Sequence, residues 1–331
     1  MQILIVSDTA NLADANSLSH QLQRRRSKIY RIIIDDLAEQ SSYSLELTSM
    51  AGWILRWQQQ NLNLAEISLV LYLCASQWPD TSVPPQIATA EEFETILHQQ
   101  ALLSALQLAS EFTALWCNTP TARQATANPV RLYHLAQQAG LRMPASLSSN
   151  EAQRIRDFIR DCGGRVLATA LSSWYPRESQ ENTGGTILSL TQCEFDDALF
   201  YSPALYQELI DVKYSVKVLI TASVVSAYQV SLSGNLQMAR GPCSQFAPYP
   251  LTISQDQIAQ WQHFLQIAGL KLATLDFVID QQHTWWFIGI SDRLHLHEMQ
   301  QAQTASTLVE DVADMLVHSL NLPAQKSAEL S

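Results

Sequence analysis

Residues 272–291 read LATLDFVIDQQHTWWFIGIS, and this stretch decides the fold. Two apolar runs, Leu272–Ile279 and Trp285–Ile290, lie on either side of the polar residues 280–283. Short apolar runs around a polar break are typical of two strands joined by a turn. The stretch therefore predicts a β-hairpin, with the acidic residue Asp276 inside its first strand.

The segment before the hairpin is also rich in strand-forming residues, in the ranges Leu205–Ile210, Val216–Ala222 and Val224–Leu232. β-Branched and aromatic residues favour strands because they pack well on a pleated surface. We expect an antiparallel sheet from Leu205 to Leu232 that joins the hairpin to form one wall of a cleft.

Helix starts in the middle of the chain carry good capping residues. Asn128-Pro129 begins a helix that Gly140 ends, because Asn caps well and Pro suits the first helical position. Asn150 and Ser254 are expected to cap two further helices.

The first part of the chain predicts a small parallel α/β lobe. Ile3–Val6 and Ile29–Ile34 are apolar runs typical of buried strands, and a helical stretch from Ala13 to Arg25 lies between them. A long helix is expected from about Ala90 to Trp116. The first residues resemble neither a signal peptide nor a membrane span.

The composition favours a cytoplasmic protein that does not bind nucleic acid. The formal net charge is -11 at pH 7, and an acidic chain repels phosphate backbones. The five cysteines are scattered without a CxxC pair, which favours reduced thiols over a disulfide framework. Only 15% of the residues are charged, which hints at association with another protein.

Three collinear stretches carry a resemblance to a known family. They are Asn118–Pro144, Tyr206–Lys217 and Leu275–Ser291. In this order and spacing they resemble the central-domain opening, the Gln-Glu hinge and the magnesium-binding strand pair of ATP-grasp ligases. The likeness is closest to the microviridin (graspetide) macrocyclases, which join side-chain carboxylates of a precursor peptide to hydroxyls or amines.

The resemblance implies an α/β fold of three lobes, with ATP clamped between two antiparallel sheets. The implied parts are an N-terminal pre-ATP-grasp lobe with the long helix (1–116), a central small lobe (117–190), a C-terminal lobe (191–322) and a disordered tail (323–331).

A few residues still match the functional positions that the resemblance implies. Gln207 and Glu208 match the nucleotide hinge, and Asp276 matches a metal-side carboxylate. Lys217 stands where the family has a phosphate-binding Arg; it keeps the charge but loses the bidentate fork. It is the one residual catalytic candidate.

Most of the implied ligands of ATP and magnesium are missing. The replaced positions are Pro129 and Thr169 for two lysines, Ser215 and Ser231 for two acidic residues, and Gly289 and Ser291 for the magnesium Glu and Asn. Phosphoryl transfer needs cations on the phosphates and oxygen ligands on the metal. We expect Thr169, Ser231, Gly289 and Ser291 to face a common, charge-poor space.

Alternatives stay open at several of these residues. Glu208 either meets an adenine amino group or has a local partner, and Asp276 could be a residual metal ligand. Lys213 or Arg165 could replace the lost lysines by reaching in from elsewhere.

A histidine pattern outside the resemblance gives a separate hypothesis. Residues 295–298, His-Leu-His-Glu, alternate like a strand and would place two imidazoles on one face. A zinc site needs a third ligand and supporting hydrogen bonds, and the sequence shows no such ligand nearby.

The leading hypothesis is a pseudoenzyme that needs no cofactor. It would bind an active ATP-grasp ligase as a heterodimer, a ribosomal precursor peptide, or both; a homodimer is a further option. The alternative is a working ATP- and magnesium-dependent carboxylate ligase with a rearranged site. A third hypothesis is a stand-alone peptide-binding module.

Overall fold

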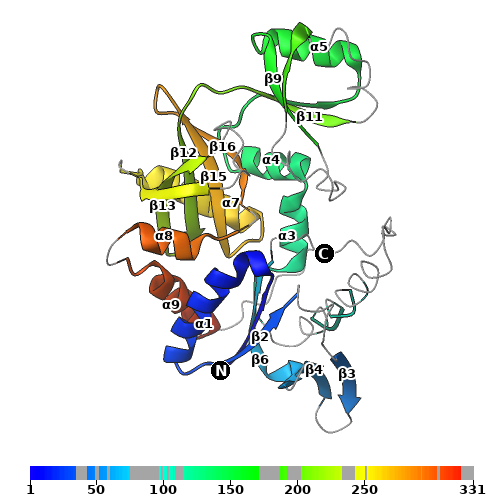
Figure 1. Cartoon of the computed structure of the whole chain (residues 1–331), viewed down its shortest axis with the longest axis vertical. Coiled ribbons are helices and arrows are strands. Elements are labelled where there is room, and N and C mark those ends of the chain that lie inside the picture. Colours follow the sequence, from blue (N-terminus) through cyan, green and yellow to red (C-terminus); the bar gives the residue numbers. More distant parts are fainter. Residues whose placement is uncertain are drawn as a thin grey trace. The chain divides into compact units, whose positions relative to one another are not determined.

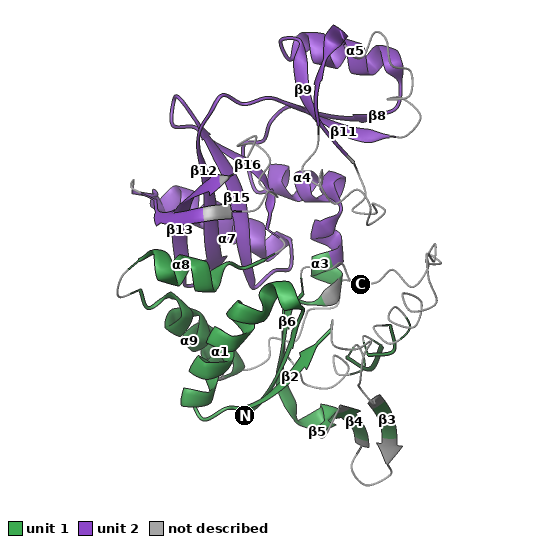
Figure 2. Ribbon diagram, in the orientation of Figure 1, with its two compact units in different colours: residues 1–123, 293–331 green, residues 124–292 purple. Residues whose placement is uncertain are grey.

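The computed structural model describes residues 1–34, 43–48, 52–57, 60–74, 97, 100–102, 104–106, 108, 115–170, 186–191, 203–232, 243–249, 252–291, 293–303 and 306–321. The chain divides into two compact units (Figure 2). Unit 1 contains residues 1–123 and 293–331, and unit 2 contains residues 124–292. Because the chain ends return to unit 1, the division does not follow sequence order; the three-lobed division stays a prediction.

Unit 1 is built on a parallel sheet of four strands in the order β2-β1-β6-β7 (Figure 1). The strands are β1 (Gln2–Ser7), β2 (Lys28–Ile33), β6 (Ile67–Leu73) and β7 (Leu115–Cys117). Helix α1 (Leu12–Arg24) connects β1 to β2, because a parallel pair needs a crossover. The expected parallel α/β arrangement is confirmed.

The predicted helix from Ala90 to Trp116 is wrong at its carboxyl end. Leu115–Cys117 forms strand β7, which pairs with Leu69–Leu71 of β6 and buries Trp116 in the core. Backbone pairing with the sheet overrides the helical pattern there. Residues 90–96 lie outside the described part of the chain.

Unit 1 also has an antiparallel sheet of three strands and two carboxyl-terminal helices. The strands are β3 (Tyr43–Thr48), β4 (Gly52–Trp57) and β5 (Gln60–Asn63), and short 3-10 turns lie at Thr9–Asn11 and Leu64–Glu66. Helices α8 (Leu296–Ala302) and α9 (Leu308–Asn321) pack beside α1 (Figure 1). Arg25 at the end of α1 contacts Asp314 of α9 at 2.5 Å.

The smaller sheet of unit 2 has the order β10-β9-β11-β8 and is antiparallel. Its strands are β8 (Ser146–Ser149), β9 (Arg165–Ala170), β10 (Thr186–Ser189) and β11 (Ala204–Glu208). Helix α5 (Ala152–Asp161) packs on it through Ile155 and Ile159. The sequence predicted Asn150 as the residue that caps α5, but the capping position is occupied by Glu151.

The larger sheet of unit 2 has five antiparallel strands in the order β14-β13-β12-β15-β16. The strands are β12 (Val212–Thr221), β13 (Val225–Leu232), β14 (Cys243–Pro248), β15 (Leu272–Asp280) and β16 (Trp285–Ile290). The predicted hairpin of β15 and β16 is confirmed. The expected single sheet from Leu205 to Leu232 is wrong, because β11 pairs with β8 and β9 instead.

Three helices complete unit 2. Helices α3 (Pro120–Ala127, which begins at the end of unit 1) and α4 (Pro129–Gln138) are consecutive, and Asn128 caps α4 by accepting a hydrogen bond from the Arg131 N–H. Helix α7 (Gln255–Ile267) begins at Ser254, which forms the expected cap together with Gln257. Within the described residues, the helices are all too short or too polar to cross a membrane.

Candidate functional site

A row of residues crosses the larger sheet at one level, with one residue from each of four neighbouring strands. The row consists of Tyr228, Lys217, Asp276 and Gly289, in that order. Directly paired residues place their side chains on the same face of a sheet. The fold thus brings Lys217 and Asp276, two of the predicted site residues, into contact.

The ammonium group of Lys217 bonds to two neighbouring residues. Its Nζ lies 2.6 Å from Asp276 Oδ1 and 2.5 Å from Ser291 Oγ. The Ser291 hydroxyl in turn donates to the same Asp276 oxygen at 2.8 Å. These contacts form a closed arrangement of Lys217, Asp276 and Ser291, which we call the Lys217 triangle.

The Lys217 triangle is buried. Lys217 is 3% exposed and Asp276 is 2% exposed, and both lie on inner strands of the sheet. Charges removed from water are tolerated only where they are paired and hydrogen-bonded. The ammonium and the carboxylate meet this requirement through each other.

The opposite face of the same strands is apolar. Phe277, next to Asp276, points to that face, where its ring lies 5.1 Å from the Trp261 ring of α7. Phe287 packs similarly against Phe264 at 5.2 Å. Because side chains alternate along a strand, the apolar side chains on one face pack against α7, and the ion pair of Lys217 and Asp276 lies on the other face.

Gly289 leaves open space beside Asp276. The residue is buried, yet a Cβ atom added to it would meet nothing within 4 Å. A β-bulge shifts the register here: Asp276 pairs with Gly289, whereas the next residue, Phe277, pairs with Phe287. The position that the resemblance assigns to a magnesium Glu is therefore next to Asp276, but it carries no side chain.

The residues present at these positions do not fit a magnesium ion. Mg²⁺ is held by carboxylates and other oxygen ligands in an octahedral arrangement. Asp276 Oδ1 and Ser291 Oγ are both bonded to the Lys217 ammonium, and Gly289 offers no ligand. Across the described ranges, no group of three or more His, Cys, Asp or Glu residues could hold a metal ion.

The predicted hinge residue Gln207 is part of a structural hydrogen-bond chain. Its Nε2 donates to the Tyr133 hydroxyl at 2.8 Å, and that hydroxyl donates to the Ile288 carbonyl at 3.1 Å. Gln207 also contacts Ser146 Oγ at 3.4 Å. The chain connects β11, α4 and β16 through the bulge residue Ile288.

Glu208 has a local partner. Its Oε2 accepts a hydrogen bond from the Ala145 N–H at 3.3 Å, and its own N–H donates to the Ala145 carbonyl at 2.9 Å. Of the two alternatives open in the sequence, this arrangement corresponds to the strand-end carboxylate with a local partner. The nucleotide-hinge role of Glu208 stays a prediction.

The two positions to which the resemblance assigns lysines lie elsewhere in unit 2. Pro129 is the first residue of α4, and Thr169 lies within β9, paired with Leu205 of β11. Neither supplies a charge. Thr169 is thus part of the smaller sheet, whereas Gly289 and Ser291 are in or next to the larger one.

Three other predicted residues are not part of the Lys217 triangle. Ser231 is exposed and lies three residues after Tyr228 on β13, so the pleat turns it toward the opposite face of the sheet. The prediction that it faces a common space with Gly289 and Ser291 is therefore wrong. Arg165 is exposed at the start of β9. Lys213 is exposed and lies 3.1 Å from the His283 ring.

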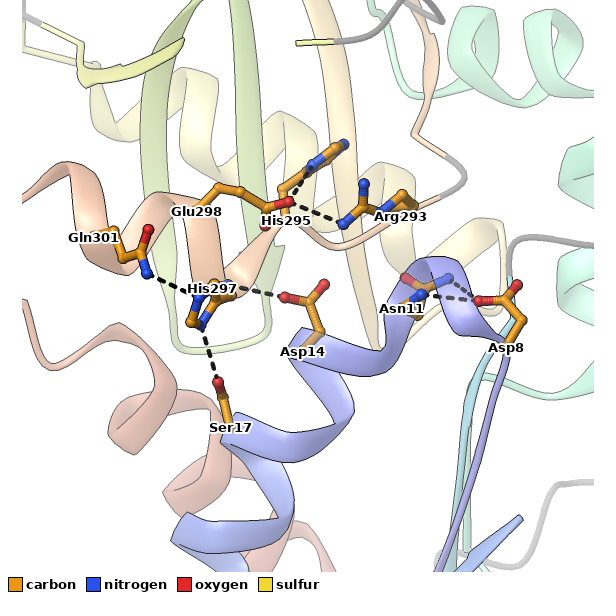
Figure 3. A network of polar contacts seen from close by, with 9 residues as sticks. All are labelled: Asp8, Asn11, Asp14, Ser17, Arg293, His295, His297, Glu298 and Gln301. Atoms are coloured by element: carbon orange, nitrogen blue, oxygen red, sulfur yellow. Dashed lines mark hydrogen bonds and ion pairs between the residues drawn. The ribbon is translucent and has the colours of Figure 1, made fainter. Parts of the chain in front are cut away.

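A second polar network lies in unit 1, between α1 and α8 (Figure 3). Asp14 of α1 is fully buried, and its Oδ1 accepts a hydrogen bond from the His297 N–H at 2.8 Å. Burial raises the pKa of Asp14. The His295 imidazole, whose Nδ1 lies 3.8 Å from Glu298 Oε1, lowers the pKa of Glu298 to about 2, and Arg293, 2.9 Å from the same oxygen, acts in the same direction.

The predicted strand at residues 295–298 is wrong, because these residues begin helix α8. The Asp14 carboxylate stabilises that helix start by accepting the His297 N–H. The His297 ring lies 3.4 Å from Ser17 Oγ and 2.8 Å from Gln301 Nε2 (Figure 3). In a helix, side chains two positions apart point in different directions, so the two imidazoles do not share a face.

Sequence reasoning missed Tyr133 and Tyr228. Tyr133 contacts the hinge residue and the bulge, but its sequence signal is only one position of a helix. Tyr228 is buried next to Lys217, and its hydroxyl has no hydrogen-bond partner among the described residues. Its place in the row follows from strand register, which sequence alone does not give.

Comparisons with solved structures find close overall likenesses. The macrocyclase MdnC of Microcystis aeruginosa, bound with precursor peptide MdnA, has a TM-score of 0.77 at 16% identity, over 96% of this chain and 100% of that one. A Chryseobacterium gregarium RiPP-associated ATP-grasp ligase, in complex with ADP and a leader and core peptide, has 0.76 at 16% identity, over 97% of each chain. The ligase PsnB with minimal precursor, Mg and ADP has 0.71 at 18%, over 96% and 97%.

Comparisons at the level of sequence find no counterpart. No protein-family model matches the chain, and no curated protein does. The likeness to the solved structures covers nearly the whole chain at identities below 20%, which shows the fold. The chain has the ATP-grasp fold found in peptide macrocyclases.

Proposed function

We propose that this chain is a catalytically degenerate ATP-grasp protein that acts as a binding partner in the maturation of a ribosomal peptide. Its partner is an active peptide-modifying ATP-grasp ligase, the precursor peptide of that ligase, or both. In this role the chain needs neither ATP nor magnesium.

The Lys217 triangle is the observation that carries this proposal. Lys217 would have to reach a phosphate and Asp276 would have to reach a metal, yet the two neutralise each other at 2.6 Å. Gly289 adds no second carboxylate beside them. A ligase of this fold activates a carboxylate as an acyl phosphate, which requires charge neutralisation on the phosphates.

The peptide part of the proposal is supported by the similar structures. MdnC was solved with a precursor peptide, and the Chryseobacterium ligase with a leader and core peptide. An ATP-grasp fold that has lost its charged ligands can keep a peptide-binding surface, because that surface does not depend on the metal ligands.

The experiment is a binding titration with the proteins encoded beside this chain. We expect its gene to lie next to genes for an intact ATP-grasp ligase and a short precursor peptide. Isothermal calorimetry should give saturable binding of the chain to that ligase or to that peptide without added nucleotide. Binding to neither of them would overturn the partner role.

The rival function, a working ligase with a rearranged site, makes the opposite prediction. Any ligand that binds the folded state stabilises it by mass action. A ligase should therefore unfold at a higher temperature with ATP and Mg²⁺, whereas this chain should gain stability only from its protein or peptide partner.

A further inference from the structure

The contacts of the Lys217 ammonium resemble those of a metal ion with its oxygen ligands. A compact positive charge is held by a carboxylate oxygen at 2.6 Å and a hydroxyl oxygen at 2.5 Å, and these two oxygens are themselves hydrogen-bonded at 2.8 Å. A Lys ammonium is a point charge, unlike the planar fork of Arg, so it can take the place of a small cation.

Charge balance explains why Lys217 and Gly289 occur together. One ammonium and one carboxylate make a neutral buried pair, as Lys217 and Asp276 do here. A second carboxylate at position 289 would leave the buried row with a net negative charge. Such a charge is costly unless a divalent cation replaces the ammonium.

The space for that second carboxylate has stayed open. A Cβ atom at Gly289 would meet nothing within 4 Å, and Gly289 is the direct strand partner of Asp276. The neighbouring residues have therefore not filled the place where the carboxylate stem would begin. The open space at Gly289 and the Lys217 triangle are independent observations, and both lie next to Asp276.

We infer that the Lys217 ammonium is an internal substitute for a divalent cation. It bonds to the oxygens of Asp276 and Ser291, keeps divalent cations out, and holds β12, β15 and the end of β16 together without metal. This inference rests on the proposed function and deepens it, because it assigns Lys217 to the cation position and not to a phosphate.

The test exchanges the internal cation for an external one. The variant Lys217→Met/Gly289→Glu removes the ammonium with little change in shape and places a carboxylate in the open space. Its matched control, Lys217→Met/Asp276→Asn/Gly289→Gln, has similar shape but no buried charge. Thermal unfolding of both variants and of the wild type is followed as Mg²⁺ is added, with no nucleotide present.

We expect the unfolding temperature of the charged variant to rise by about 4 °C or more at saturating Mg²⁺. The wild type and the uncharged control should show no such rise. If the charged variant is unfolded without metal, added Mg²⁺ should restore its folding.

Two results would overturn the inference. One is an uncharged control that folds while the charged variant gains nothing from Mg²⁺. The other is a wild type that is itself stabilised by Mg²⁺ to the same extent as the charged variant. Neither result concerns partner binding, so failure here is distinguishable from failure of the proposed function.

Discussion

At the scale of single residues, the Lys217 triangle stabilises the fold only as a complete set. Lys217→Met leaves the Asp276 carboxylate buried at 2% exposure without its ion-pair partner. Breaking one half of a buried pair costs about 3–5 kcal/mol of unfolding free energy, whereas apolar replacement of both halves is often neutral. Urea unfolding without metal should show that loss for Lys217→Met and a much smaller loss for Lys217→Met/Asp276→Leu. Equal losses in the two variants would mean that the unpaired Asp276 carboxylate is not the cause of the destabilisation.

The carboxylate of Glu298 provides a pH test at the same scale. Its pKa is lowered to about 2 in the folded chain, mainly by the neighbouring His295 imidazole, from an ordinary value of 4.5. A lowered pKa contributes stability above pH 4.5 that is lost as the pH falls toward 2. Asp14 acts in the opposite direction, because burial raises its pKa.

We therefore expect Glu298→Gln to flatten the fall in unfolding free energy between pH 4.5 and pH 2. The control is Asp211→Asn, which changes an exposed carboxylate in a loop and should leave the slope nearly unchanged. Denaturant unfolding at several pH values measures both slopes. An unchanged slope in Glu298→Gln would contradict the assigned role of His295 and Arg293.

At the scale of elements, one hydroxyl connects α4 to strands of two sheets. Tyr133 accepts from Gln207 of β11 and donates to the Ile288 carbonyl of β16. Tyr133→Phe removes both bonds and leaves the buried Gln207 amide without that acceptor, which should cost about 1–3 kcal/mol. Chemical denaturation should show this loss. The control Tyr249→Phe removes the hydroxyl of a partly exposed tyrosine and keeps its ring contact with Trp285, so it should be nearly neutral. A neutral Tyr133→Phe would show that the chain of bonds does not hold these elements together.

The sequence predicts most helices and strands well. It fails where contacts between residues far apart in the chain determine the secondary structure. The hairpin of β15 and β16 and the cap at Ser254 follow from local patterns, so they were predictable. Strand Leu115–Cys117 was missed because its stability comes from β6, some forty residues earlier. The start of α8 was missed because Asp14, on a distant helix, stabilises it.

The candidate site was predictable only in part, for the same reason. The resemblance selected Lys217, Asp276, Gly289 and Ser291, and the structure brings these residues together. It did not predict that Lys217 contacts Asp276, because strand register determines that contact. Nor did it predict Tyr133 or Tyr228, which have no chemical signature in the sequence.

At the scale of the whole molecule, the chain has the ATP-grasp fold, and the proposed function holds that it lacks the charged groups of the ATP-grasp reaction. The likeness to the macrocyclases extends over 96% of the chain at a TM-score of 0.77, although only 16% of residues are identical. A fold tolerates such divergence because hydrophobic pattern and strand pairing specify it, whereas a reaction depends on a few charged groups. Two residues at positions that the resemblance assigns to the reaction, Lys217 and Asp276, neutralise each other.

The most direct test of this account is calorimetric titration of the wild-type chain with ATP in the presence of Mg²⁺. PsnB, which was solved with Mg and ADP, serves as the positive control. Because the Lys217 triangle is closed and Gly289 supplies no ligand, we expect no heat beyond dilution from the wild-type chain. Saturable, magnesium-dependent binding of ATP comparable to that of PsnB would contradict the account.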